Sequence, residues 1–423
     1  MRSQVDLPPF HIIAAALHTT TERLVREVTA PQDTAPDWND FEWAVARAVS
    51  VMQGISGLLD RRLKWQGPAG WREFLADQHA HMRARDQQIE LLLARLDVAL
   101  AQAGIAFVPL KGSAIRALRL HHPGERPQGD IDLLLDRADL AAAGRLLETI
   151  GYQPLYSNRH HDVYAPASRL PPAGFGEHAD SPIKIELHGH VAEALPVDDV
   201  DITATILPAN RIPGANAYAS FAALVRHAGL HAAGNMRANA MRYFQIYEIA
   251  QLAVRMTTAD WRELVGQGEA RAQGWWLYPP FVMAARYLPG TVPAHWLTAL
   301  RSLCPRRLRE RFEQVSIYEV SWSNLRIPAL PGLEWSRSLG HTLRFARSRA
   351  WPGRVARDEL ASARTSESSL MRARWYGASQ AERIVRWLFT RPPRVQTLAL
   401  VGASLAADPH PAQNSPRRRQ SFQ

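Results

Sequence analysis

The part of the chain best suited to chemistry is residues 129–135, which read Gly-Asp-Ile-Asp-Leu-Leu-Leu. Side chains two residues apart in a β-strand point to the same face, so Asp130 and Asp132 are expected side by side, with the apolar residues between and after them in a core. Two adjacent carboxylates repel each other unless a cation lies between them. The pattern therefore favours Mg²⁺ or Mn²⁺, which take oxygen ligands and leave positions open for phosphate oxygens.

A Lys-Gly-Ser turn precedes this strand by fewer than 20 residues. Residues 105–110 are expected to form a short apolar strand that leads into the turn, and a helix is expected over 114–121. Gly112 permits close approach to the backbone, and the first N–H groups of that helix are suited to an anion. Lys111, Gly112 and Ser113 are therefore the predicted phosphate cradle beside the metal site.

Lysine is rare in this chain, with three residues against 47 arginines. A lysine retained in such a sequence indicates a place where a compact, mobile ammonium is preferred to a planar guanidinium. Lys111 and Lys184 flank the acidic strand and are candidates for contacts with a triphosphate, although Lys184 is also suited to pairing with a neighbouring acid. Arg126 is a candidate for a bidentate phosphate clamp, with a salt bridge in its loop as the alternative.

The periodicity predicts an α+β fold in which a small mixed-sheet core lies between mostly helical regions. Residues 1–104 are expected to be helical, including single helices over 44–59 and 82–103. The core is expected over 105–198, a second helical region over 199–391, and a basic, disordered tail over 392–423. A long loop with proline and glycine, residues 166–182, is expected to be functional or mobile.

Four motifs carry a resemblance to a known family. They are Leu-Lys-Gly at 110–112, Arg-Pro at 126–127, Gly-Asp-Ile-Asp-Leu at 129–133 and Glu-Leu-His at 186–188. Around residues 100–190 the chain resembles the nucleotidyltransferase fold of the polymerase beta superfamily and, more narrowly, the bacterial family of uncharacterised nucleotidyltransferases. The distance from Ser113 to Asp130 is longer than that superfamily usually has, and a glutamate stands where an aspartate is commoner.

The resemblance implies metal-dependent transfer of a nucleoside monophosphate from an NTP to an acceptor, with two ions that stabilise the entering and leaving oxygens. Asp130 and Asp132 would bind the metals, and Glu186 would be the third carboxylate, as a base or a ligand of the second metal. His188, at strand spacing from Glu186, would orient that carboxylate. The acceptor, whether small molecule, peptide or protein, is not specified by these motifs.

Other histidines and aromatic residues offer alternatives. A zinc site could be assembled from His188, His190 and the pair at 160–161, although their spacing is not typical of one. His227 and His231, four residues apart on an expected helix, are suited either to the site or to a buried structural role. Tyr243, Tyr247 and Glu248 are candidates for an acceptor pocket by their position on the next expected helix. Trp275 and Trp276 are expected in the core.

Composition narrows the class of protein. The single cysteine, Cys304, excludes an internal disulfide and is expected to be a buried thiol. The longest apolar run, residues 397–407, is too short for a membrane span, so a cytoplasmic protein is expected. From residue 301 onward there are 22 arginines against nine acidic residues, and these are expected mainly on solvated helix faces. Two other functions stay open: a catalytically silent nucleotide- or metal-binding accessory protein, and a transferase directed to nucleic acid by this basic third.

Overall fold

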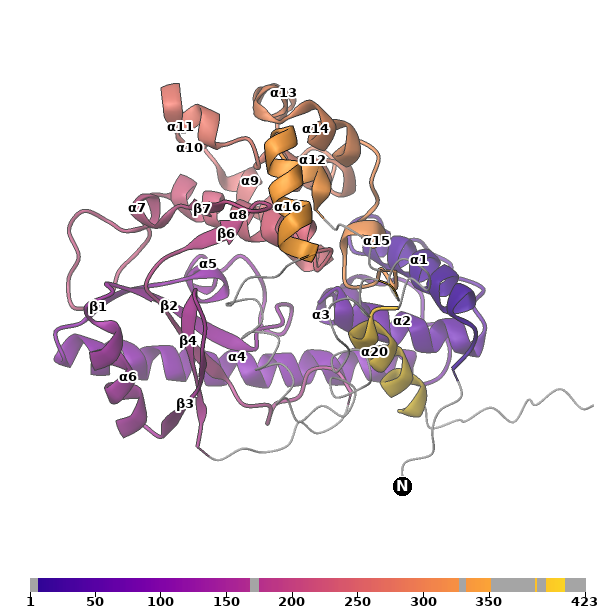
Figure 1. Ribbon diagram of the computed structural model, residues 1–423. Helices are drawn as coiled ribbons and strands as arrows, with labels where there is room; N and C mark the ends of the chain where they lie inside the picture. Colours follow the sequence, from indigo (N-terminus) through magenta and orange to yellow (C-terminus); the bar gives the residue numbers. More distant parts are fainter. Residues whose placement is uncertain (1–6, 168–174, 327–331, 351–384, 386–392, 408–423) are drawn as a thin grey trace, which may run out of the picture.

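The computed structural model describes residues 7–167, 175–326, 332–350, 385 and 393–407. Its centre is a mixed six-stranded sheet with helices packed on both faces, and two larger groups of helices lie beside the sheet (Figure 1). The α+β class predicted from the sequence is therefore confirmed. Among the described helices, none combines the length and the apolar character that crossing a bilayer requires.

The sheet has the strand order β3-β4-β5-β2-β1-β8. Its strands are β1 (Ala106–Pro109), β2 (Asp130–Leu135), β3 (Tyr152–Ser157), β4 (His161–Pro166), β5 (Lys184–His188) and β8 (Gly214–Ala215). The central strands β2 and β5 run parallel, whereas β1 is antiparallel to β2 and β4 is antiparallel to β5. A separate hairpin joins β6 (Ala192–Ala194) to β7 (Asp199–Asp201).

One face of the sheet is covered by α4 (Trp71–Gln102) and α6 (Leu140–Thr149), which lie below the strands in Figure 1. Ile131, Leu133 and Leu135 point to this face and are fully buried against Leu96 and Leu147. The strand alternation expected from the sequence is therefore present. It leaves the odd-numbered residues of β2 in the core and the aspartates on the other face.

The opposite face of the sheet is covered by α5 (Lys111–Ala117) and α8 (Phe221–Arg237), with α9 (Tyr243–Arg255) packed against α8. Ser220 caps α8, because its hydroxyl accepts the backbone N–H of Ala223 at 3.0 Å. Leu134 of β2 points to this side and belongs to the larger apolar core that these helices share with the N-terminal helices.

The N-terminal helices are α1 (Phe10–Glu27), α2 (Asp40–Met52) and α3 (Ser56–Arg62). The prediction of one helix over 44–59 is wrong, because the chain breaks at Gly54, which has a φ of +67°. The helix predicted from residue 82 begins eleven residues earlier, at Trp71. These helices pack on the C-terminal ones: the N–H of Phe244 donates to the carbonyl of Gln53 at 3.1 Å.

The C-terminal helices complete the larger core. They are α7 (Thr203–Ile206), α10 (Thr258–Val265), α11 (Gly268–Gln273), α12 (Tyr278–Tyr287), α13 (Ala294–Leu303), α14 (Arg306–Phe312), α15 (Ile317–Val320), the 3₁₀ turn η1 (Leu333–Trp335) and α16 (Leu339–Ala350). Trp275 and Trp276 are buried in this core, as predicted, and so is the thiol of Cys304. The predicted domain limits at 104 and 198 stay predictions.

The tail predicted to be disordered contains a helix, α20 (Val395–Ala406), so that prediction is wrong for these residues. The helix packs on α2: Val401 is fully buried, and the hydroxyl of Ser404 donates to the carbonyl of Ala44 at 2.7 Å. Its apolar residues were too few for a membrane span but suffice for a helix that buries one side. Residues 408–423, with the arginine run, lie outside the described residues.

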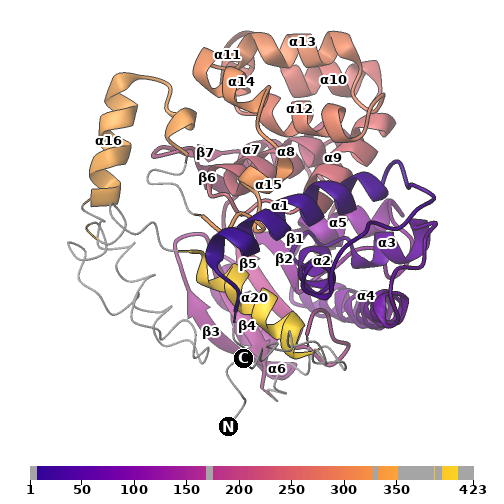
Figure 2. The ribbon, with the colours of Figure 1, turned by 90° about the vertical axis from the view of Figure 1, so that its right-hand side faces the viewer.

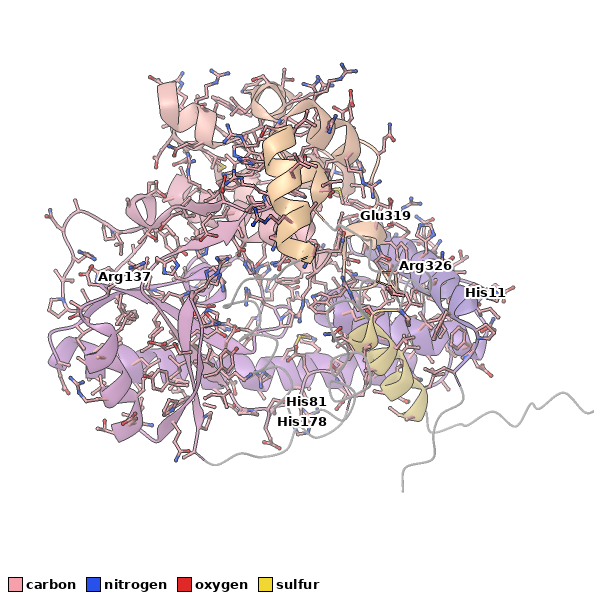
Figure 3. All side chains as sticks on the ribbon, in the orientation of Figure 1. His11, His81, Arg137, His178, Glu319 and Arg326 are labelled. Atoms are coloured by element: carbon pink, nitrogen blue, oxygen red, sulfur yellow. The ribbon has the colours of Figure 1, made fainter. Side chains whose placement is uncertain are left out.

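The described end of the long loop, from Phe175, lies along α4. Phe175 stacks on Phe74 with ring centroids 5.9 Å apart, and His178 packs on His81 at 4.4 Å (Figure 3). Gln78 holds the same segment, because its Oε1 accepts the N–H of Glu177 at 2.7 Å. This end of the loop therefore has a fixed position beside the sheet.

Candidate functional site

The parallel pairing of β2 with β5 brings the predicted acids together. Asp132 lies opposite Glu186, Asp130 opposite Lys184, and Leu134 opposite His188. Residues paired in this way have side chains on the same face, so the two aspartates, Glu186 and His188 all point toward α5 and α8 rather than into the core below. The site is assembled by the register of these two strands, whose paired residues are 54 positions apart in sequence.

Lys111 provides the cation closest to Asp132. Its Nζ donates to Oδ1 of Asp132 at 2.8 Å, and its backbone has a φ of +49°, in the left-handed region that is costly for a residue with a side chain. Burial alone would lower the pKa of Lys111, but the charges of Asp132 and Asp130 raise it above its ordinary value. The residue is therefore held charged beside the acidic strand.

The two aspartates differ in their surroundings. Burial and the charge of Asp132 raise the pKa of Asp130 to about 6. Burial alone would also raise the pKa of Asp132, but the charge of Lys111 and a hydrogen bond from His188 hold it well below its usual range. With the other described residues, the carboxylate of Asp130 makes no hydrogen bond or ion pair. An incompletely neutralised pair of buried carboxylates fits a hard divalent cation such as Mg²⁺ or Mn²⁺.

Arg126 lies against the turn of the predicted phosphate cradle. Its Nε donates to Oε1 of Glu248 at 2.8 Å, and its Nη1 donates to Oε1 of Gln128 at 3.2 Å. A Cβ on Gly112 would collide with this guanidinium, so the glycine is required for the approach. Glu248 therefore anchors the arginine. Burial alone would raise the pKa of Glu248, but the charge of Arg126 and a hydrogen bond from His121 hold it at about 2.

Ser113, predicted as part of the phosphate cradle, does not line the cavity described below. It is buried, and its hydroxyl accepts Nε2 of Gln128 at 3.2 Å. The same Nε2 donates to the backbone carbonyl of Asp130 at 2.8 Å, so Ser113 and Gln128 join the turn to the acidic strand. Gln128 was missed in the sequence analysis, although it directly precedes the Gly-Asp-Ile-Asp motif.

A cavity of about 440 Å³ opens between the acidic strand, the turn and the helices α8 and α9. Asp130 and Asp132 line it, together with Lys111, Gly112 and Arg126. The opposite wall comes from residues that no motif had indicated: Asn235, Arg242, Phe244, Gln245 and Trp322. Four of the predicted site residues are not among the described residues that line the cavity: Ser113, Lys184, Glu186 and His188.

Two histidines of α8 lie at the wall of the cavity. His227 and His231 of α8 both line it. The hydroxyl of Tyr218 accepts the backbone N–H of Lys111 at 3.3 Å and lies 2.7 Å from Nδ1 of His227, so we assign the hydroxyl proton to this second bond. Burial and the charge of Lys111 hold the pKa of His227 well below its usual range. The neutral ring then carries its proton on Nε2, as a hydrogen-bond donor.

The expected acceptor residues on α9 have other contacts. Tyr243 is fully buried in the core, and the hydroxyl of Tyr247 accepts Nη2 of Arg62 at 2.6 Å. Only Glu248 of the three lines the cavity, and it is bound to Arg126.

Glu186 lies beside two histidines. Its Oε2 is 3.5 Å from Nε2 of His161 and 3.7 Å from Nε2 of His188. His161, Glu186 and His188 form a group whose ligand atoms all lie within 4.8 Å of one another. Among the described residues, no such group contains all three of the predicted acids. His161 was considered in the sequence analysis only as half of the pair at 160–161.

The zinc site considered from the sequence is assembled only in part. His160 and His190 stack on each other with centroids 5.8 Å apart, separate from the group of His161, Glu186 and His188. Strand alternation explains this separation, because His160 and His161 are neighbours in sequence and only His161 pairs with His188 in the sheet.

The chain was compared with known protein families, curated proteins and solved structures. The family described as uncharacterised nucleotidyltransferase matches residues 39–289, which include the whole sheet and the helices α8 and α9. No curated protein and no solved structure matches the chain. The matched region contains the acidic strand, the Lys-Gly-Ser turn and Glu186. The chain belongs to the family of uncharacterised nucleotidyltransferases.

Proposed function

We propose that this protein transfers a nucleoside monophosphate from an NTP to an acceptor, with a divalent cation bound at Asp130 and Asp132. The observation that carries the proposal is the position of these two carboxylates at the wall of a cavity that also holds Lys111 and Arg126. Carboxylates that can bind a metal ion and cationic side chains that can bind phosphate therefore line the same cavity. The chain that contains them belongs to a nucleotidyltransferase family.

In the proposed reaction the acceptor oxygen forms a bond to the α-phosphorus of the NTP, and the bond from that phosphorus to the bridging oxygen breaks. Pyrophosphate leaves with the electron pair, and the proton of the acceptor passes to water. The cation supplies positive charge for the phosphate oxygens. Lys111 and Arg126 contact the triphosphate, Gly112 leaves room for that contact, and Glu186 holds a second ion.

Two features support these roles. The guanidinium of Arg126 is fixed by Glu248, so it needs little ordering before it binds an anion. Lys111 is paired with Asp132 alone among the described acidic residues, and a divalent cation at that carboxylate would free the ammonium for a phosphate.

The cavity wall of Phe244, Gln245 and Trp322 offers aromatic and amide groups to a base or an acceptor.

The alternative of a transferase directed to nucleic acid has less support. Several arginines of the basic third are paired with acids: Arg301 with Glu313, and Arg344 with both carboxylate oxygens of Asp198 at 3.0 and 3.1 Å. In Figure 2, α16, which carries Arg344, stands at the edge of the molecule. On this helix Phe345 is buried and Leu343 is 70% exposed. Residues 351–384 lie outside the described residues.

The test is to incubate the protein with each of the four NTPs, labelled at the α-phosphate, together with Mg²⁺ and an extract of the host cell. We expect one fraction of the extract, or the protein itself, to become labelled. The Asp132→Asn variant should give no label, because it loses a ligand of the cation. A silent accessory protein would bind NTP in the same conditions and label nothing, and that result would contradict the proposal.

A further inference from the structure

Glu186 has a nitrogen-rich environment that the roles above do not explain. In the sheet, β5 pairs with β2 on one side and with β4 on the other, and His161 of β4 lies opposite His188. Two imidazoles and one carboxylate therefore share the face of the sheet that carries Asp132. The rings of His161 and His188 have centroids 4.9 Å apart.

The separations in this group match those between ligands of one metal ion. Nitrogen and oxygen ligands lie about 2.0–2.2 Å from zinc in proteins, so two ligands at a tetrahedral angle are about 3.4 Å apart. The nitrogens of His161 and His188 are 3.5 and 3.7 Å from Oε2 of Glu186. All three ligand atoms come from neighbouring strands of one sheet, which is a rigid support for such a site.

We propose that His161, Glu186 and His188 form a second metal site that binds a first-row transition ion, such as Zn²⁺, Mn²⁺ or Co²⁺, in preference to Mg²⁺. Imidazole ligands suit these ions, whereas Mg²⁺ selects oxygen ligands and retains its waters. The two cation sites of the protein would then differ in kind: oxygen ligands at Asp130 and Asp132, and a mixed nitrogen and oxygen set beside them.

A hydrogen bond between His188 and Asp132 connects this site to the acidic strand. Nε2 of His188 donates to Oδ1 of Asp132 at 2.9 Å. A metal ion at Nε2 would replace that proton, which would be released to solvent, and a fourth position on the ion would stay open to water or a phosphate oxygen. His188 would thereby lie between the two cation sites, and Glu186 would belong to the site with imidazole ligands.

The inference rests on the proposed function only for the use of the ion, not for its binding. An ion at this position would add positive charge beside Asp132, where the proposed reaction needs it. Binding can therefore be measured without nucleotide, acceptor or turnover. If the protein binds the ion through these residues but transfers no nucleotide, the metal site is supported and the proposed transferase function is contradicted.

The experiment is a titration of the metal-free, full-length protein with Co²⁺ alone, followed by visible absorption. We expect one equivalent to bind with the strong bands of a four- or five-coordinate ion. His161→Gln should weaken this binding more than about 100-fold, beyond the usual effect of losing only a hydrogen-bond partner of a ligand. His190→Gln is the matched control, because His190 stacks on His160 outside the group, and it should bind Co²⁺ as the unmodified protein does.

Three results would overturn the proposal. They are no bound Co²⁺ in the unmodified protein, unchanged binding in His161→Gln, and a loss in Asp130→Asn as large as that in His161→Gln, which would place the ion at the aspartates. If His161→Gln fails to fold by circular dichroism, pulsed electron paramagnetic resonance of the unmodified protein decides, with one equivalent of Mn²⁺ added in an excess of Mg²⁺ that occupies the aspartates. Couplings to imidazole nitrogen are expected, and their absence would contradict the site.

Discussion

Nζ of Lys111 lies 2.8 Å from Oδ1 of Asp132, and this ammonium is the nearest full charge that compensates the acidic strand. The pair is mostly buried, with 27% of the lysine side chain and 4% of the aspartate side chain exposed. A buried ion pair of this kind makes the protein sensitive to the loss of either partner. The same ammonium is the group that we expect to move to the triphosphate.

The substitution Lys111→Met should destabilise the metal-free protein by about 2 kcal/mol, because it leaves a buried carboxylate without its cation. Added Mg²⁺ should restore part of the loss in melting temperature, since the cation replaces the ammonium. Lys64→Met is the matched control: Lys64 pairs with Asp33 at an exposed position, and its loss should cost less than about 1 kcal/mol. Equal losses in the two variants would contradict this role of Lys111.

Asp130 should make the stability of the metal-free protein depend on pH. Its pKa is raised to about 6 from 3.8, so the folded protein holds this proton more tightly than the unfolded chain. Stability should therefore fall as the pH rises from about 4 to about 6, and the cost should be complete above pH 6. Asp130→Asn removes the charge and should raise the melting temperature at pH 7.5, on the order of 2 °C, but not at pH 4.

Asp77→Asn serves as the control for this effect, because the side chain of Asp77 is 65% exposed and its 3.6 Å pair with His81 is a surface pair of little energetic weight. It should leave the melting temperature unchanged at both pH values. Mg²⁺ should raise the melting temperature of the unmodified protein and not that of Asp130→Asn. A lower melting temperature for metal-free Asp130→Asn at pH 7.5 would show that Asp130 stabilises the fold, against this interpretation.

Gly112→Ala should weaken NTP binding by about 10–100-fold, because the added Cβ displaces Arg126, and a charge-assisted hydrogen bond contributes about 1.5–3 kcal/mol. The measurement is the Kd of an NTP with Mg²⁺, by calorimetry. Gly129→Ala offers a close comparison, since Gly129 also lines the cavity and a Cβ there meets no atom within 4 Å. If Gly129→Ala weakens binding as much as Gly112→Ala, the position of Arg126 is not the cause.

The helix α20 should be required for stability rather than dispensable. Val401→Asp places a charge in the buried contact with α2 and should lower the free energy of unfolding by more than about 3 kcal/mol. Ala403→Asp, at an exposed position two residues further along the helix, should change it by less than about 0.5 kcal/mol. Removal of residues 393–423 should destabilise the protein as Val401→Asp does. A stable truncated protein would contradict the packing of α20.

Part of the sheet could be predicted, because the alternation of polar and apolar residues along one strand can be recognised from neighbouring positions in the sequence. The alternation of Asp130 and Asp132 with Ile131 and Leu133 fixes which side of β2 is polar, and the structure has that arrangement. The pairing of Asp132 with Glu186 was expected only through the family resemblance, since no local pattern specifies the register of β2 and β5.

The contacts that could not be predicted join residues far apart in sequence. Arg126 is held by Glu248 on α9, and His161 meets Glu186 only because β4 pairs with β5. Ser113 reads as a phosphate ligand in its motif, yet it is bound to Gln128. The helix α20 was not predicted, because residues 397–407 were considered only as a possible membrane span. Their packing on a second helix was not considered.

The most direct test of the proposed reaction is the position of the transferred phosphate. The protein is given an NTP labelled at the α-phosphate in one reaction and at the γ-phosphate in a parallel one, with Mg²⁺ and the labelled fraction of host extract as acceptor. Nucleotidyl transfer predicts that the acceptor carries the α-label only, that the γ-label appears in pyrophosphate, and that Asp132→Asn gives neither product. An acceptor that carries the γ-label, or α-label transfer that Asp132→Asn retains, would contradict the account.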